Sequence, residues 1–258
     1  MPERTSYAPG TPSWIDIGTD VEAAKAFYTG LFGWSTADAG PVEETGGYGF
    51  FTTADAKLLA GYGPQQNPGP PFWTTYIATD DADASTAKVE AAGGTVVVPP
   101  MDVMDAGRMA VFQDTEGAFF SVWQAGRHLG AEVVNEPGAF CWSELSTRDP
   151  EAAKAFYAAV FGWGAEASES EAMAYTEWQL GGESIGGMMD MPPMVPVEVP
   201  AYWLVYFAVE DTDASVARAK ELGATALLDG QDTPAGRIAV LADPQGATFA
   251  LIALVADL

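Results

Sequence analysis

The chain has 258 residues and carries 36 acidic against 11 basic side chains, a formal net charge of −25. A surface this acidic repels phosphate backbones and anionic lipid headgroups, so we expect no nucleic-acid partner and no membrane partner. With 48% hydrophobic residues the chain can bury a sizeable core without disulfides, and its one cysteine, Cys141, cannot pair within the chain. The N-terminus shows no apolar signal segment, and together these features favour a cytoplasmic protein.

A repeat of half the chain length organises the sequence. Residues 22–34 read EAAKAFYTGLFGW and residues 151–163 read EAAKAFYAAVFGW, which are identical at ten of thirteen positions. Two further blocks, which begin at residues 70 and 106, recur 130 and 129 residues later. The spacing indicates a duplication of one domain.

Each half begins with a predicted strand and helix. The strands read WIDIG and WSELS, and in the first half Thr19 and Glu22 follow with the spacing of a capping box. In the second half Asp149 precedes Pro150, which is typical of an N-cap followed by proline at the first helical position. The helices then carry apolar residues at helical spacing.

A second strand, a second helix and a hairpin complete each half. The strands WTTYIAT and WLVYFAV are aromatic and β-branched, and the next helices begin in acidic clusters that suit the positive end of a helix dipole. Hairpin turns are predicted at DTEG (114–117) and DPQG (243–246). We therefore expect domains at residues 1–126 and 138–258, joined by a linker at 127–137 that lacks periodicity.

The repeated unit, with FYxxxFGW after the first strand and DxxG before the last, resembles the vicinal oxygen chelate superfamily. That superfamily includes glyoxalases, bleomycin-resistance proteins and extradiol dioxygenases. The two-domain form is similar to a mycobacterial antigen and to actinobacterial proteins labelled as hydroxylases. The resemblance implies an α+β fold of tandem glyoxalase-like domains, with four βαβββ modules and curved mixed β-sheets. It leaves the chemistry open, because this fold hosts many functions.

The resemblance also implies positions for metal ligands, and none of them holds a histidine, carboxylate or amide. These positions are Ser13 or Trp14, Thr75 and Ser121 in the first half, and Trp142 or Ser143, Val205 and Ala250 in the second. The single histidine, His128, lies in the predicted linker, where we expect a solvated side chain. One histidine cannot build a 2-His-1-carboxylate iron site, so we expect no metal and no cofactor. An all-oxygen Mg²⁺ or Ca²⁺ site is the chemical alternative.

The same positions predict an aromatic concave surface with a few polar groups. Alternation along the first strand puts Trp14 and Asp16 on one face, and Trp142 and Glu144 on the matching face of the second half. Asp16 and Glu144 are thus the candidate acids or bases. The candidate ligand-binding residues are Trp14, Trp73, Thr75, Trp142, Trp203, Arg108 and Arg237. The structural alternatives are core packing for the aromatic residues and pairing with nearby acids for the arginines, and Cys141 is expected to be a packed thiol.

Three functions fit this pattern. The first is a metal-free protein that binds a small hydrophobic or aromatic metabolite, for sequestration or sensing. The second is a metal-independent enzyme, related to glyoxalases or hydroxylases, that uses Asp16 or Glu144 as acid or base. The third is an interaction scaffold. The missing ligands favour the first or third, and the sequence leaves the ligand and the choice between monomer and homodimer open.

Overall fold

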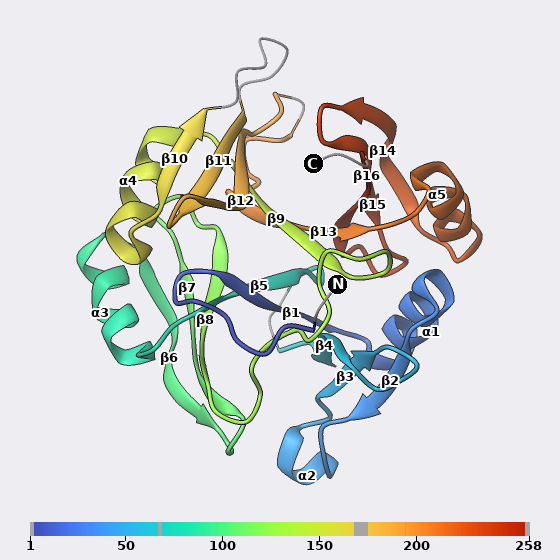
Figure 1. Ribbon diagram of the computed structural model, residues 1–258, viewed down its shortest axis with the longest axis horizontal. Helices are drawn as coiled ribbons and strands as arrows, with labels where there is room; N and C mark the ends of the chain where they lie inside the picture. Colours follow the sequence, from blue (N-terminus) through green and yellow to red (C-terminus); the bar gives the residue numbers. More distant parts are fainter. Residues whose placement is uncertain (1–2, 67–68, 168–174, 194, 256–258) are drawn as a thin grey trace.

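The computed structural model describes residues 3–66, 69–167, 175–193 and 195–255, and it divides into two similar halves (Figure 1). The elements of the first half are β1 (Pro12–Thr19), α1 (Val21–Phe32), β2 (Ser35–Asp38), α2 (Val42–Thr45), β3 (Gly49–Thr52), β4 (Leu58–Pro64), β5 (Trp73–Ala78), α3 (Ala82–Ala91), β6 (Thr95–Val103), β7 (Gly107–Gln113) and β8 (Phe119–Ala125). Those of the second half are β9 (Phe140–Thr147), α4 (Pro150–Phe161), β10 (Gly164–Ala167), β11 (Tyr175–Leu180), β12 (Glu183–Asp190), β13 (Tyr202–Ala208), α5 (Thr212–Glu221), β14 (Thr225–Thr233), β15 (Gly236–Ala242) and β16 (Thr248–Leu254).

Each half forms one mixed sheet of eight strands. The first sheet has the order β2-β3-β4-β1-β5-β8-β7-β6, and the second repeats it as β10-β11-β12-β9-β13-β16-β15-β14. In each sheet two modules meet where their first strands pair antiparallel, β1 with β5 and β9 with β13. The predicted α+β fold of tandem glyoxalase-like domains is confirmed. In the described part of the chain, every helix is too short or too polar to cross a membrane.

The helix ends follow the predicted signals, with one difference at α1. The C-cap of α1 is Gly33, whose left-handed backbone (φ 72°) suits glycine. The N-cap is Asp20, which accepts the Ala23 N–H at 3.1 Å, and the predicted N-cap Thr19 is wrong. Thr19 instead ends β1, because its hydroxyl donates to Gln245 Oε1 of the other half at 2.7 Å.

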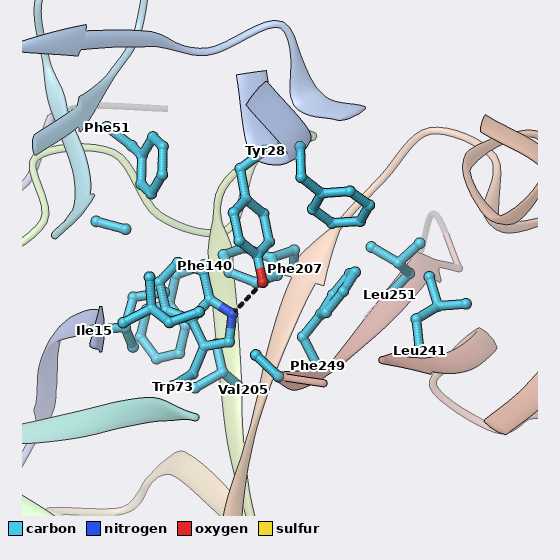
Figure 2. Packing of buried hydrophobic residues seen from close by; sticks show 14 of the residues in the cluster. Ile15, Tyr28, Phe51, Trp73, Phe140, Val205, Phe207, Leu241, Phe249 and Leu251 are labelled. Atoms are coloured by element: carbon cyan, nitrogen blue, oxygen red, sulfur yellow. Dashed lines mark hydrogen bonds between the residues drawn. The ribbon is translucent and has the colours of Figure 1, made fainter. Parts of the chain in front are cut away.

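The two halves pack together through one face of each sheet, here called the interface face. Figure 2 shows the largest buried cluster, in which Ile15 and Trp73 of the first half lie near Val205, Phe207 and Phe249 of the second. A second cluster joins the halves on the other side, where α3 and α4 lie. Burial of apolar surface is the dominant favourable contribution to folding, so each half contributes to the core of the other. The opposite face of each sheet is called the outer face below.

Two reciprocal hydrogen-bond chains cross this interface. The Tyr28 hydroxyl donates to Asp243 Oδ2 at 3.0 Å and accepts from the Trp73 indole N–H at 2.9 Å. The other oxygen of Asp243 accepts two backbone N–H groups in the predicted DPQG turn. The counterpart chain joins Tyr157, Asp114 and Trp203 at 3.0 and 2.9 Å. Each half therefore holds a turn of the other through a buried tyrosine hydroxyl.

Replacing Tyr28 or Tyr157 with phenylalanine should lower the free energy of unfolding by about 1–3 kcal/mol, because a buried carboxylate and an indole N–H both lose a partner. Urea unfolding followed by circular dichroism measures the change. Tyr202→Phe is the matched control, since the Tyr202 hydroxyl makes no hydrogen bond to the described residues. Equal, small losses in all three variants would contradict a role for these hydroxyls in joining the halves.

Candidate functional site

A carboxylate that accepts two tyrosine hydroxyls lies on the outer face of the first sheet. Tyr48 and Tyr76 both donate to Asp16 Oδ2, at 3.1 and 2.9 Å. The Trp14 indole N–H donates in turn to the Tyr48 hydroxyl at 3.1 Å. Trp14 and Asp16 share this face, as the alternation of β1 requires. We call this set the Asp16 cluster.

The second half repeats the arrangement with glutamate in place of aspartate. The Tyr206 hydroxyl donates to Glu144 Oε1 at 2.9 Å. The Trp142 indole N–H donates to the Tyr175 hydroxyl at 2.8 Å, and the Tyr175 hydroxyl lies near enough to the Glu144 carboxylate to oppose in part the burial that raises the pKa of Glu144. We call this set the Glu144 cluster. Its recurrence from two diverged halves shows that the grouping belongs to the duplicated unit.

A glycine on the neighbouring strand makes room for each cluster. Gly61 of β4 pairs with Asp16, and a Cβ atom built on Gly61 collides with the Tyr48 hydroxyl. Gly187 of β12 holds the counterpart position in the second half. Glycine inside a strand often marks a close approach of another group, and here that group is a phenol ring. The tyrosine can therefore reach across the sheet to the carboxylate.

Burial raises the pKa of both carboxyls. The pKa of Asp16 rises to about 6 because burial penalises the charged form, while hydrogen bonds from Tyr76 and Tyr48 partly oppose this effect. Burial likewise raises the pKa of Glu144. Burial and the neighbouring carboxylate hold the pKa of Tyr76 well above its usual range, so this hydroxyl remains a donor at neutral pH. A carboxyl that titrates near neutrality can both release and accept a proton.

Trp73, Thr75 and Trp203 lie on the interface face, which corrects the prediction that they share the site with Trp14. The two indoles belong to the reciprocal chains described above, and the Thr75 hydroxyl lies 2.8 Å from the Ser143 hydroxyl of the other half. The residues of β5 that face outward are Thr74 and Tyr76, one position to either side of Thr75. A shift of one residue moves a side chain to the opposite face of a strand. The ligand position that the resemblance implied, Thr75, is therefore one residue away from an outward-facing position.

The candidate arginines form ion pairs with neighbouring acids. Arg108 contacts Asp83 at 2.9 Å and Asp102 at 2.8 Å. Arg237 makes the counterpart contacts with Asp213 and Asp232, both at 2.9 Å. The structure thus shows the pairing that the sequence left as the alternative to ligand recognition.

The prediction that His128 is solvated is wrong. Its ring centroid lies 4.4 Å from that of Trp14 and 5.5 Å from that of Trp123, and the Trp123 indole N–H donates to the His128 carbonyl at 2.7 Å. Burial lowers the pKa of His128 to about 4, so the imidazole is uncharged at neutral pH. The linker sequence gave no signal for this position, because non-local backbone contacts decide the path of the linker.

The residues on the outer faces do not fit the metal that the resemblance implies. Among the described residues, no three His, Cys, Asp or Glu side chains come together in a way that could hold a metal ion. Each cluster supplies one carboxylate, and tyrosine hydroxyls already engage it. Of the other carried-over positions, Thr75 and Val205 face the opposite half. Each cluster is therefore a hydrogen-bonded carboxylate–tyrosine group that lacks, among the described residues, the side chains of a metal site.

The outer face of the second half keeps partly accessible side chains around its cluster. Cys141, Trp142, Tyr202, Ile238 and Val240 are half-buried there and pack on Tyr206 and its neighbours. Burial raises the pKa of the Cys141 thiol to about 12, which agrees with a packed thiol. A separate surface cavity of about 510 Å³ lies beyond the ends of β9 and β12, and it is lined by Thr147, Arg148, Asp190 and residues 191–193 and 195–197.

Family models match most of the chain. Residues 17–122 match the Glyoxalase/Bleomycin resistance protein/Dioxygenase superfamily, and residues 139–252 match a glyoxalase-like domain. The chain therefore belongs to the glyoxalase/bleomycin resistance/dioxygenase superfamily, in a form with two tandem domains.

Curated relatives share this two-domain length. The chain is 45% identical to CFP32 of Mycobacterium tuberculosis, named as a candidate glyoxylase, with 98% of each chain covered. It is 44% identical to the anthracycline biosynthesis protein DnrV of Streptomyces peucetius, over 97% of this chain and 95% of that protein.

Solved structures of the superfamily share the fold. The Mn(II)-bound glyoxalase of Novosphingobium aromaticivorans gives a TM-score of 0.64 at 18% identity, with 95% of this chain and 82% of that chain covered. The 2,3-dioxygenase LapB of Pseudomonas sp. KL28 gives 0.64 at 12% identity, with 96% and 93% covered. At these identities the likeness concerns the fold alone.

The raised pKa of Asp16 makes a prediction about stability. A carboxyl whose pKa is higher in the folded state stabilises the fold below its unfolded pKa of about 4, and this contribution is lost as the pH rises through about 6. The asparagine of Asp16→Asn cannot ionise. As the pH rises from 4 to 8, the free energy of unfolding of this variant should therefore increase by roughly 2 kcal/mol relative to that of wild type. Urea unfolding at both pH values measures this difference. Asp80→Asn, at an exposed position, is the control, and parallel profiles for wild type and Asp16→Asn would refute the prediction.

The side chains at the ligand positions that the resemblance implies also predict the metal content of the protein. Elemental analysis of the untagged protein after dialysis should find far less than one zinc, nickel or iron per chain, because the family ligand positions hold no suitable side chains. A chelator should leave the melting temperature unchanged. Stoichiometric metal that survives dialysis, with stability lost to the chelator, would show that a site exists elsewhere.

Proposed function

We propose that the Glu144 cluster binds a small hydrophobic or aromatic metabolite without a metal, for sequestration or sensing. The observation that carries the proposal is a buried carboxylate that accepts the Tyr206 hydroxyl and lies near the Tyr175 hydroxyl and the half-buried Trp142. Small-molecule sites are mostly apolar and contain a few placed polar groups that fix the ligand's orientation. The cluster offers both components on one face of one sheet.

The chemistry of the cluster favours a planar ligand that carries a hydroxyl or carbonyl group. The indole of Trp142 can stack on a flat ring, which contributes roughly 0.5–1.5 kcal/mol beyond the area buried. Tyr175 and Tyr206 can donate to a ligand oxygen, and Glu144 can accept from a ligand hydroxyl. One relative is named for anthracycline biosynthesis, and that name supports an aromatic metabolite. We further propose a cytoplasmic monomer or homodimer without nucleic-acid or membrane partners.

A metal-independent enzyme, related to glyoxalases or hydroxylases, is the second candidate. The raised pKa of Glu144 and of Asp16 favours it, since a buried carboxyl can take a proton from one atom of a ligand and return it to another. The tyrosine hydroxyls would stabilise negative charge that develops on a ligand oxygen. The interaction scaffold is the third reading, and it gains support only if neither outer face binds a small molecule.

Screening a library of aromatic and polycyclic metabolites by thermal shift and calorimetry tests the proposal. We expect a ligand that raises the melting temperature with the logarithm of its concentration once it is in excess over its Kd, because it binds the native state. Trp142→Leu should weaken its affinity at least tenfold, about 1.4 kcal/mol, through lost stacking. Glu183→Gln, at an exposed acid of β12 in the same sheet, should leave the affinity unchanged.

Glu144→Gln separates the two leading functions. For a binding protein it should change the affinity, and no turnover of the ligand should be detectable in either protein. For an enzyme it should abolish turnover and leave the affinity near that of wild type. Urea unfolding of each variant first establishes that the fold is intact. A library without hits would remove both functions and leave the scaffold.

A further inference from the structure

The linker between the halves runs back across the outer face of the first sheet. The His128 N–H donates to the Ala106 carbonyl at 3.0 Å, and the Ala131 N–H donates to the Ser13 carbonyl of β1 at 2.9 Å. The next residue, Glu132, makes two hydrogen bonds with Leu58 of β4. Its backbone N–H donates to the Leu58 carbonyl, and its carboxylate accepts the Leu58 N–H. Backbone bonds on both sides of His128 therefore fix the path of the linker.

These bonds place the imidazole of His128 among three aromatic rings. Its centroid lies 4.4 Å from Trp14 with an interplanar angle of 82°, 5.5 Å from Trp123 and 5.7 Å from Phe50. Neither ring nitrogen makes a hydrogen bond to the described residues. Contacts with the three aromatic rings and the backbone bonds on either side therefore hold the imidazole in place, and hydrogen bonds of its nitrogens to the described residues do not contribute.

Trp14, the first ring of this set, also belongs to the Asp16 cluster. Its indole is 2% exposed and donates to Tyr48, which donates to Asp16. The imidazole therefore contacts the Asp16 cluster through Trp14, on the same outer face of the sheet. In the second half the matching Trp142 is half-buried, and no described segment crosses its sheet in the way that the linker crosses the first.

We infer that Trp14, Phe50 and Trp123 form a binding site for a small uncharged planar ring, and that the chain fills this site with its own imidazole. The occupant defines the class of ligand, since edge-to-face contacts with Trp14 and Trp123 and a tilted contact with Phe50 favour a flat, neutral guest. The first half is then closed by an internal occupant, and a free ligand enters it only when His128 leaves. This inference rests on the proposed function only in taking the outer faces to be ligand sites.

His128→Ala tests the inference directly. The backbone bonds that fix the linker do not use the imidazole, so the substitution should leave an apolar cavity, and such cavities bind small apolar molecules. Toluene and 4-methylimidazole are the probes, added at pH 9, where 4-methylimidazole is uncharged, and followed by calorimetry and thermal shift. Leu129→Ala is the matched control, because the neighbouring Leu129 side chain is 44% exposed and lies outside the ring site.

The expected result is one more bound equivalent of each probe in His128→Ala than in wild type or Leu129→Ala. A variant that binds the same number of equivalents as wild type overturns the inference. If wild type binds no probe and His128→Ala binds one equivalent, the inference about the first half stands. The proposal that the Glu144 cluster of the second half binds aromatic molecules then fails. The two proposals therefore fail in distinguishable ways.

Nuclear magnetic resonance of the wild-type imidazole keeps the test decisive if His128→Ala does not fold. The chain has one histidine, so its ring signals need no assignment. We expect them to be displaced by the neighbouring indole rings and to titrate near pH 4. Random-coil positions and titration near the ordinary pKa of about 6.5 would overturn the inference, because the ring would then lie in solvent.

Discussion

Alternation of side chains along the central strands separates the surface that joins the two halves from the surface that carries the Asp16 and Glu144 clusters. On β1, Ile15 enters the interface core, while Asp16 meets two tyrosine hydroxyls on the outer face. On β5, the Thr75 hydroxyl bonds Ser143 and the Trp73 ring packs on Phe207, both of the other half, while Tyr76 completes the Asp16 cluster. The period of two is a property of strand geometry, so between the register shifts the placement of one residue fixes the faces of its neighbours on that strand.

The interface face and the outer face each contain carboxylate–tyrosine contacts, and the carboxylates differ in their other hydrogen-bond partners. At the interface Asp114 accepts the Tyr157 hydroxyl and also two backbone N–H groups of its own turn, so its position is fixed by main-chain geometry. On the outer face Asp16 accepts hydrogen bonds from side chains. Hydroxyl groups rotate to suit a new partner. The interface contact therefore suits a structural role, and the outer-face contact suits exchange with a ligand.

The duplicated sequence predicted the fold and half of each cluster. Trp14 and Asp16 were placed together by alternation alone, because that rule needs no knowledge of neighbouring strands. Tyr48 was not predicted, since the segment that leads into β3 has diverged between the halves and the approach of Tyr48 to Asp16 depends on sheet register. Thr75 was assigned to the wrong face by a count that is one residue off. His128 was misplaced because non-local backbone bonds, which carry no sequence pattern, draw the linker onto the sheet.

Infrared difference spectroscopy of the intact protein tests most directly whether these buried carboxyls are the centres of the two outer faces. The stretching band of a protonated carboxyl should persist well above pH 4, since burial raises the pKa of Asp16 to about 6. Asp16→Asn should remove part of this band, Glu144→Gln another part, and a saturating aromatic ligand should shift the Glu144 contribution. A spectrum in which every carboxyl titrates near pH 4, unchanged by either substitution or by ligand, would contradict a role for the clusters in binding or catalysis.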